Sequence, residues 1–155
     1  GLRSMDALEI KTVDKDTDLA EELVRFVENF SWEAVKAHML EVLREWRFTD
    51  WERVFAATAE GRIVGMATIM KTDYYPLPEL YPWISSVFVT EACRGHRISQ
   101  RLIDAANAYA KEIGFDRTYI PTEFVGFYEK YGYCYQTDIV NYGGGTDRLY
   151  RKELK

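Results

Sequence analysis

The sequence has few of the residues that build disulfide scaffolds or metal sites. Its 155 residues include only two cysteines, Cys93 and Cys134, and only two histidines, His38 and His96. Two cysteines without metal-ligand spacing can neither cross-link a small secreted fold nor hold a structural zinc, and they favour a reducing compartment. We therefore expect a cytoplasmic protein without a metal, in which both thiols are structural.

Long apolar runs and an excess of basic residues are also missing. No apolar run approaches the ~18 residues that a membrane-spanning helix needs, and no basic segment followed by an apolar one opens the chain. The 20 Lys and Arg against 25 Asp and Glu give a net charge of −5. This charge argues against nucleic acid as a partner and suits a cationic molecule. We expect neither a membrane nor a nucleic-acid partner.

What remains is the composition of an ordinary globular domain, with 47% hydrophobic and 29% charged residues. A chain of this length forms one domain at the usual ~100–200 residues per domain. Residues 1–4, Gly-Leu-Arg-Ser ahead of Met5, read as a cloning remnant. We expect a single domain over residues 5–155.

The first half of the chain predicts a strand, two helices and a hairpin. Alternation over residues 7–13 indicates a strand, and apolar residues recur at helical spacing over 19–30 and 32–46. The expected helix caps are an aspartate of the first turn (Asp14, Asp16 or Asp18) and then Ser31. Residues 53–59 and 63–70 predict a hairpin around Glu60-Gly61-Arg62. The segment 72–82 is too rich in proline for a helix.

The second half predicts a strand over 83–89 and a helix over 98–113 that ends at Gly114. A strand over 118–121, a short helix over 123–130 closed by Gly132, and strands over 133–142 and 148–152 follow. Strands and helices in this order predict a mixed α/β sandwich.

The most informative junction runs from Val87 to Ser99, where a strand passes through a tight turn into a helix. The first N–H groups of a helix lack internal partners and lie at the positive end of its dipole, so they can hold a phosphate or pyrophosphate. Arg94, His96 and Arg97 add cationic side chains. An ordinary strand-to-helix turn with solvated basic residues is the alternative.

A second segment, Phe-Tyr-Glu-Lys-Tyr-Gly-Tyr over residues 127–133, places Tyr128 on a short helix before a glycine and a strand. A tyrosine within hydrogen-bond reach of a leaving group can act as a general acid. Aromatic side chains beside a glycine turn are also ordinary core residues. By itself, this segment therefore fits either a catalytic tyrosine or a core tyrosine.

Together, the two segments resemble motifs of the GCN5-related N-acetyltransferase (GNAT) superfamily, and the resemblance covers nearly the whole chain. The family's V-x-x-x-x-R-G-x-G-x-G/A stretch corresponds to Val89–Ser99, and its F-Y-E-K-x-G-F/Y stretch to residues 127–133. Arg97 and Ser99 replace the family's two later glycines. The asparagine that many members carry after the fifth strand is missing from residues 122–126.

The resemblance implies an α/β (α+β) fold with a mixed, mostly antiparallel sheet of six to seven strands. About four helices flank this sheet, which is splayed at its fourth and fifth strands.

The resemblance also implies acetyl-CoA as co-substrate, with the pyrophosphate at the start of the helix and the pantetheine arm along the preceding strand. Arg97 then either points outward or reaches a phosphate. The implied cofactor-binding residues are Val87, Phe88, Val89, Arg94, Gly95, His96, Arg97, Ile98, Ser99 and Gln100.

By the same resemblance, a free amine attacks the thioester carbonyl directly. A backbone N–H near Phe88 or Val89 stabilises the oxyanion, and Tyr128 protonates the CoA thiolate. The first candidate for the base is Glu123, just after a strand. Ser85 or Ser86 acting through water, and Glu79, stay open as alternatives.

The resemblance places the acceptor amine between the two early helices and the loop over residues 72–82. The implied acceptor-binding residues are Tyr74, Tyr75, Glu79, Tyr81, Trp83 and Ser85, with Asp73 or Glu79 supplying charge. The aromatic residues alone are equally typical of a hydrophobic lid. A small-molecule amine is the leading acceptor. A protein or peptide N-acetyltransferase, a catalytically silent acyl-CoA-binding regulator and a homodimer stay open.

Overall fold

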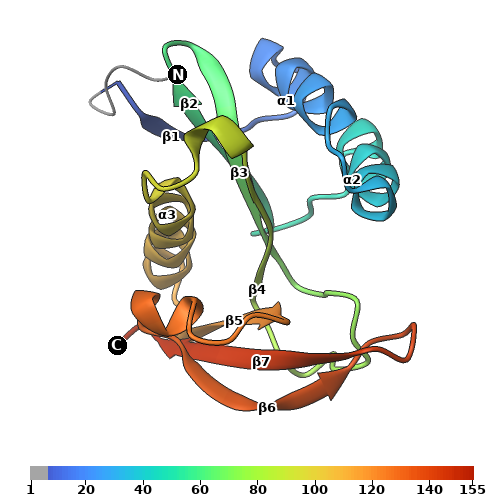
Figure 1. Ribbon diagram of the computed structural model, residues 1–155, viewed down its shortest axis with the longest axis vertical. Helices are drawn as coiled ribbons and strands as arrows, with labels where there is room; N and C mark the ends of the chain where they lie inside the picture. The colour runs from blue at the N-terminus through green and yellow to red at the C-terminus, as the bar shows by residue number, and fades with distance from the viewer. Residues whose placement is uncertain (1–6) are drawn as a thin grey trace.

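The computed structural model describes residues 7–155, so residues 1–4 and Met5 lie outside the described residues. A seven-stranded sheet in the order β1-β2-β3-β4-β5-β7-β6 carries helices on both faces (Figure 1). The elements in chain order are β1 (Glu9–Thr12), α1 (Asp18–Glu28), α2 (Glu33–Glu45), β2 (Arg53–Ala59), β3 (Arg62–Met70), β4 (Trp83–Val89), the 3-10 turn η1 (Glu91–Cys93), α3 (Ile98–Glu112), β5 (Arg117–Thr122), the 3-10 turn η2 (Tyr128–Tyr131), β6 (Cys134–Val140) and β7 (Thr146–Glu153).

The apolar stripes of the helices explain how they pack. Leu23 and Val27 of α1 are fully buried with residues of α2 on one face of the sheet. Leu102 and Ile103 of α3 are fully buried on the other face. A fully buried aliphatic side chain of this size contributes about 1.5–3 kcal/mol. None of the helices in residues 7–155 has the length and apolar character needed to cross a bilayer.

The expected splay between the fourth and fifth strands is confirmed. The parallel strands β4 and β5 pair only at Trp83 and Tyr119, where the Tyr119 N–H donates to the Pro82 carbonyl oxygen (3.0 Å). Beyond this pair the two strands diverge, as Figure 1 shows. The edge of β4 that faces β5 therefore has no strand partner from Ser85 to Val89.

Gly65 of β3 lets β4 and α3 approach this strand closely. A Cβ atom at this position would lie 2.8 Å from the Phe88 carbonyl oxygen and 3.2 Å from Leu102 Cδ1. The first atom belongs to the backbone, so a side chain here would push β4 away. No sequence motif had singled out this glycine.

Both predicted helix caps were wrong. Thr17 caps α1, because it is the extended residue just before the helix and its Oγ1 accepts from the Ala20 N–H (3.2 Å). The residue before α2 is Trp32, which makes no side-chain cap, so Ser31 lies one position too early.

The β2–β3 turn is also shorter than expected. It has two residues, Glu60 and Gly61, with φ of 52° and 78°, and paired positive φ values are typical of type I′ hairpins.

The helix predicted over residues 123–130 is the largest correction. Only residues 128–130 are helical there, and they belong to the 3-10 turn η2. Gly126 has a φ of +83°, a left-handed value that a right-handed helix does not contain. The described residues therefore hold three α-helices rather than four, and residues 123–127 form a loop with Phe124 and Val125 exposed.

Candidate active site

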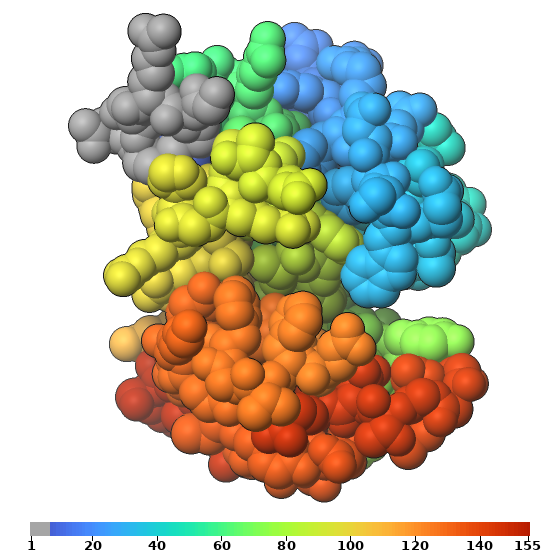
Figure 2. Space-filling model, viewed as in Figure 1, coloured from blue at the N-terminus to red at the C-terminus, as the bar shows by residue number. Residues whose placement is uncertain are grey.

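A furrow crosses the molecule where β4 and β5 separate. In the space-filling view, η1 and α2 lie above this furrow, the η2 segment and the C-terminal strands lie below it, and β4 is visible at its bottom (Figure 2). The unpaired edge of β4 is thus accessible from outside. An extended chain with amide groups can add to such an edge as a further strand would.

A β-bulge shapes β4 at the furrow. Ser85 pairs with Thr68 and Phe88 with Met66, so Ser86 and Val87 both lie opposite a single residue of β3. Ser86 takes a φ of 51° to make the bulge. Bulges re-aim side chains and leave a residue out of the ladder. Here Phe88 packs with the α1–α2 cluster while Val87 packs with the α3 cluster.

The start of α3 has the geometry of an anion site. Arg97 precedes the helix with a φ of 59° and makes no side-chain cap, so the first N–H groups of the helix stay free of a capping side chain. Gly95 has a φ of +89° with open space where a Cβ atom would stand. Arg94, His96 and Arg97 are exposed, so cationic side chains surround these donors. The residues present fit the pyrophosphate of CoA.

The remaining residues of this segment differ in what they can offer. Ile98 is only 1% exposed, so its backbone N–H alone can face a ligand. Ser99 and Gln100 are half-buried. The side chain of Arg97 forms no salt bridge with the described residues.

Arg97 allows a direct test of this site. A non-glycine residue in the left-handed region costs about 1–2 kcal/mol, and glycine avoids that cost at the expense of a more flexible unfolded chain. We expect Arg97→Gly to keep or slightly raise the melting temperature and to weaken CoA binding about threefold to tenfold through the lost charge. Calorimetric titration with CoA measures the second effect. Arg97→Asn, which also tolerates positive φ, should lose the same affinity, and unchanged affinity in both variants would place Arg97 away from the phosphates.

A hydrogen bond joins the two sequence motifs. Ser99 Oγ in the first turn of α3 lies 3.2 Å from the hydroxyl oxygen of Tyr131 in η2, 32 residues further along the chain. The bond fixes η2 beside the proposed phosphate site. Tyr128 of η2 shares its hydrophobic cluster with Val87 and Val89 of β4.

Tyr128 is a buried tyrosine with a raised pKa. Its side chain is 8% exposed, and burial, with a smaller contribution from the charge of Tyr131, raises its pKa to about 12. It is therefore protonated at neutral pH. Its hydroxyl has no hydrogen-bond partner among residues 7–155, so it is available to a ligand.

A polar network holds η2 against β7, and the sequence did not suggest it. Tyr150 of β7 is fully buried, and its hydroxyl donates to Glu129 Oε2 (3.0 Å) while accepting from Arg148 Nε (3.0 Å). The sequence spacing of these residues did not predict the network, because β7 comes next to η2 only when the sheet has formed.

The structure brings together only some of the aromatic residues predicted to line the acceptor site. Tyr75 stacks on Trp83 (5.6 Å between ring centroids), and Trp83 is only 1% exposed, so it is a core residue. Tyr81 instead packs on Trp51 and Phe115, which belong to the α3 side of the sheet. The structure thus separates Tyr81 from Tyr75, since the two side chains pack against different hydrophobic clusters.

Tyr74 is exposed beside the furrow, where its ring meets that of Tyr142 edge to face at 5.7 Å. Glu79 is exposed in the same loop, and Ser85 is half-buried, with its carbonyl oxygen accepting from Thr68 Oγ1 (3.0 Å). Glu123 is exposed just after β5. No side chain among residues 7–155 forms a salt bridge with Glu123.

Two aromatic residues that the periodicity had assigned to helix faces lie at the furrow instead. Phe30 and Trp32, in the connection between α1 and α2, contact Phe88 at centroid distances of 4.3 and 5.9 Å. Trp32 is 60% exposed. An exposed tryptophan that contacts the bulged strand is a signal for binding that helical spacing conceals.

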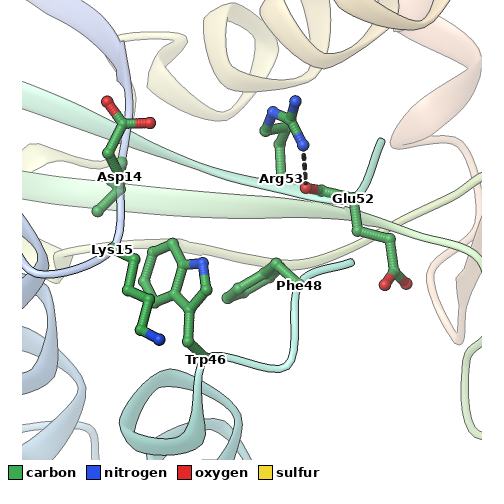
Figure 3. Close-up of a pocket in the computed structure, with 7 residues that line it drawn as sticks. Asp14, Lys15, Trp46, Phe48, Glu52 and Arg53 are labelled. Atoms are coloured by element: carbon green, nitrogen blue, oxygen red, sulfur yellow. Dashed lines mark hydrogen bonds between the residues drawn. The ribbon is translucent and has the colours of Figure 1, made fainter. Parts of the chain in front are cut away.

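A separate hollow lies between the β1–α1 turn and the α2–β2 connection (Figure 3). It is lined by Val13, Asp14, Lys15, Trp46, Phe48, Glu52 and Arg53 and has a volume of about 130 Å³. Ligand sites for small molecules are usually ~300–1,000 Å³. The Glu52 carboxylate is already occupied by Thr49 Oγ1 (2.9 Å) and the Lys71 N–H (2.9 Å). Residues 7–155 contain no group of three His, Cys, Asp or Glu side chains that could hold a metal ion.

Comparison with known proteins agrees with the furrow and the two motifs. The sequence profile of the Acetyltransferase (GNAT) family matches residues 18–133. Among solved structures, aminoglycoside 6'-acetyltransferase type Ii superposes with a TM-score of 0.75 at 18% identity, over 95% of this chain and 97% of that one. An aminoglycoside 6'-N-acetyltransferase complexed with coenzyme A gives 0.74 at 16%, over 95% and 97%.

A GNAT family N-acetyltransferase from Escherichia coli in complex with CoA gives a TM-score of 0.73 at 15% identity, over 96% of this chain and 82% of that one. No curated protein matches the sequence. The chain belongs to the GNAT acetyltransferase family, because the family profile covers well over half of it. It is an acetyltransferase, and its co-substrate is acetyl-CoA.

Proposed function

We propose that the protein transfers the acetyl group of acetyl-CoA to a primary amine of a small molecule by direct attack in a ternary complex. The observation that carries the proposal is the Ser99–Tyr131 contact of 3.2 Å. It joins the anion site at the start of α3 to the turn that holds Tyr128, beside the open edge of β4.

Each element then has one task. The N–H groups at the start of α3, with Arg94 and His96, bind the pyrophosphate. The edge from Val87 to Val89 aligns the pantetheine arm, and a backbone N–H near Phe88 or Val89 stabilises the oxyanion. Tyr128 donates its proton to the departing thiolate. No covalent intermediate on the enzyme is needed.

The surroundings of the furrow favour a small acceptor over a protein chain. Tyr74 and Tyr142 pack together at one side of it, and Phe30 and Trp32 lie against Phe88 of β4. A peptide acceptor would need an open groove between these side chains. Two of the similar structures are named as aminoglycoside acetyltransferases, which is consistent with a small amine.

CoA is expected to raise the melting temperature of the protein, because a ligand that binds only the folded state stabilises it. Arg94→Ala should weaken CoA binding about tenfold, since it removes one charge-assisted contact to phosphate. Arg62→Ala, which removes an exposed arginine at the far β2–β3 turn, should leave the affinity unchanged. Titration calorimetry with CoA measures both.

Thiol release from acetyl-CoA across diamines, aminoglycosides, amino acids and peptides tests the transfer itself. Release with a small amine supports the proposal. Release with peptides alone would make the protein a peptide N-acetyltransferase, and CoA binding without release for any acceptor would make it a regulator. No melting shift at millimolar CoA would remove the cofactor site.

A further inference from the structure

Asp73 lies in the β3–β4 connection with one carboxylate oxygen unsatisfied. Its Oδ1 accepts the Tyr74 N–H (2.6 Å), whereas its Oδ2 is shielded from solvent and has no hydrogen-bond partner in the described part of the chain. A buried acceptor without a donor costs about 1–3 kcal/mol. Such an atom marks the place of a donor that the described residues do not supply.

The groups around this carboxyl come from three other elements. Burial raises the pKa of Asp73, and Asp147 of β7 raises it further, while the Tyr74 N–H, Ser85 of β4 and His38 of α2 oppose the rise. The Ser85 Oγ lies 3.2 Å from Thr68 Oγ1, so that hydroxyl already has a partner. Asp73 therefore lies near Ser85 of β4, His38 of α2 and Asp147 of β7.

Asp147 brings a second negative charge to the same place. Its Oδ2 accepts from the Tyr75 hydroxyl (2.6 Å) and from Asn141 Nδ2 (3.4 Å), so the carboxylate is held firmly. Neither Asp73 nor Asp147 forms a salt bridge with a Lys, Arg or His among residues 7–155. Two neighbouring carboxylates without a cation repel each other, and one ammonium group neutralises only one of them.

We propose that Asp73 Oδ2 binds the reacting ammonium group of the acceptor and accepts its proton, and that Asp147 binds a second cationic group, so that the enzyme selects amines carrying at least two positive charges. The aromatic pair Tyr74 and Tyr142 borders this site and can cover the second cation by cation–π contact. This inference rests on the proposed function and names its acceptor class.

The proton inventory of the step is complete. The Asp73 carboxylate takes one proton from the ammonium, and the freed lone pair forms the C–N bond to the thioester carbonyl carbon. The C–S bonding pair leaves on sulfur, which Tyr128 protonates. The nitrogen releases its second proton to water, and exchange with water restores Asp73 and Tyr128. The products are the amide, CoA thiol and one proton.

The test compares diamines with monoamines of matched size on the CoA-loaded protein. The probes are 1,4-diaminobutane against 1-aminobutane, and 2-deoxystreptamine against cyclohexylamine, with binding followed by calorimetry. At least one diamine should bind about tenfold more tightly than its monoamine. The preference should fall below about threefold in Asp147→Asn, whereas Asp73→Asn should weaken the binding of the diamine and of its monoamine alike. Asp104→Asn, on the exposed face of α3, should keep it.

Equal binding of diamines and monoamines to the native protein, a preference that survives Asp147→Asn, or unchanged amine binding in Asp73→Asn would overturn this inference while CoA binding keeps the proposed function intact. Loss of CoA binding by the native protein would instead overturn the proposed function and this inference with it. A rate defect in Glu123→Gln together with a normal rate in Asp73→Asn would assign the base to Glu123.

Stability provides a second readout that a structural aspartate would not give. Because the pKa of Asp73 is raised in the folded state, its contribution to stability is present at low pH and lost as the pH rises through that value. Asp73→Asn should therefore melt above the native protein at pH 8, and the gap should close as the pH falls toward 4. A lower melting temperature for the variant at pH 8 would show that the carboxylate serves the fold, and would overturn the proposal.

Discussion

Tyr128→Phe is expected to lower kcat by about tenfold or more and to leave the affinity for acetyl-CoA nearly unchanged, because only the donor hydroxyl is removed. General acid catalysis is typically worth ~10²–10⁴-fold, but a CoA thiolate is already a tolerable leaving group. The pKa of Tyr128, about 12, keeps the hydroxyl protonated across the working pH range. Its loss should therefore lower the rate by a similar factor from pH 6 to 9.

Steady-state rates with saturating acetyl-CoA measure this effect, with circular dichroism to verify folding. Tyr109→Phe is the matched control. Tyr109 belongs to α3, away from η2, and its hydroxyl donates to the Trp51 carbonyl oxygen (2.8 Å). Full kcat in Tyr128→Phe would make Tyr128 a packing residue and water the proton donor.

Gly65→Ala is expected to give the largest loss of stability. The new Cβ atom would meet the Phe88 carbonyl oxygen at 2.8 Å, so β4 must move. Overpacking of this kind costs about 1–3 kcal/mol, which lowers the melting temperature of a chain of this size by about 2–12 °C. CoA binding should weaken as well, because the displaced segment is the bulged strand that lines the furrow.

Thermal unfolding with and without CoA checks both effects. Gly143→Ala serves as the control for stability, because its closest neighbours are the flexible side chains of Asn141 and Tyr74 at 3.2 Å, which can move aside. A melting temperature for Gly65→Ala equal to that of the native protein would show that β3 and β4 tolerate a wider spacing.

Local patterns in the sequence predicted those elements whose burial follows from spacing alone. The apolar face of α3 and the stop at Gly114 identified that helix nearly to the residue. Two strand-like runs around a short glycine turn found β2 and β3, and the resemblance that the two motifs carry gave the splayed sheet. Amphipathic periodicity works for the helices because each of them buries one face against the sheet whatever its neighbours are.

The failures came where one residue controls the backbone. The helix expected over residues 123–130 is interrupted by Gly126 at a φ of +83°, which composition does not reveal. The predicted caps were wrong because the bend of the chain sets where each helix begins. Thr17 and Trp32 hold the N-cap positions for that reason, although other residues nearby have side chains suited to capping.

The sequence by itself determined the strand and helix pattern, the tight turn before α3 and the position of Tyr128 beside a glycine turn, because each of these lies in contiguous residues. Only the tertiary structure decided which distant residues share the furrow. Tyr75 meets Asp147 across 72 positions, Ser99 meets Tyr131 across 32, and Tyr81 turns to the opposite face from Tyr75. The physical reason is that spacing reports how much a residue is buried, whereas its partner is set by strand order and register, which arise from the packing of the whole sheet.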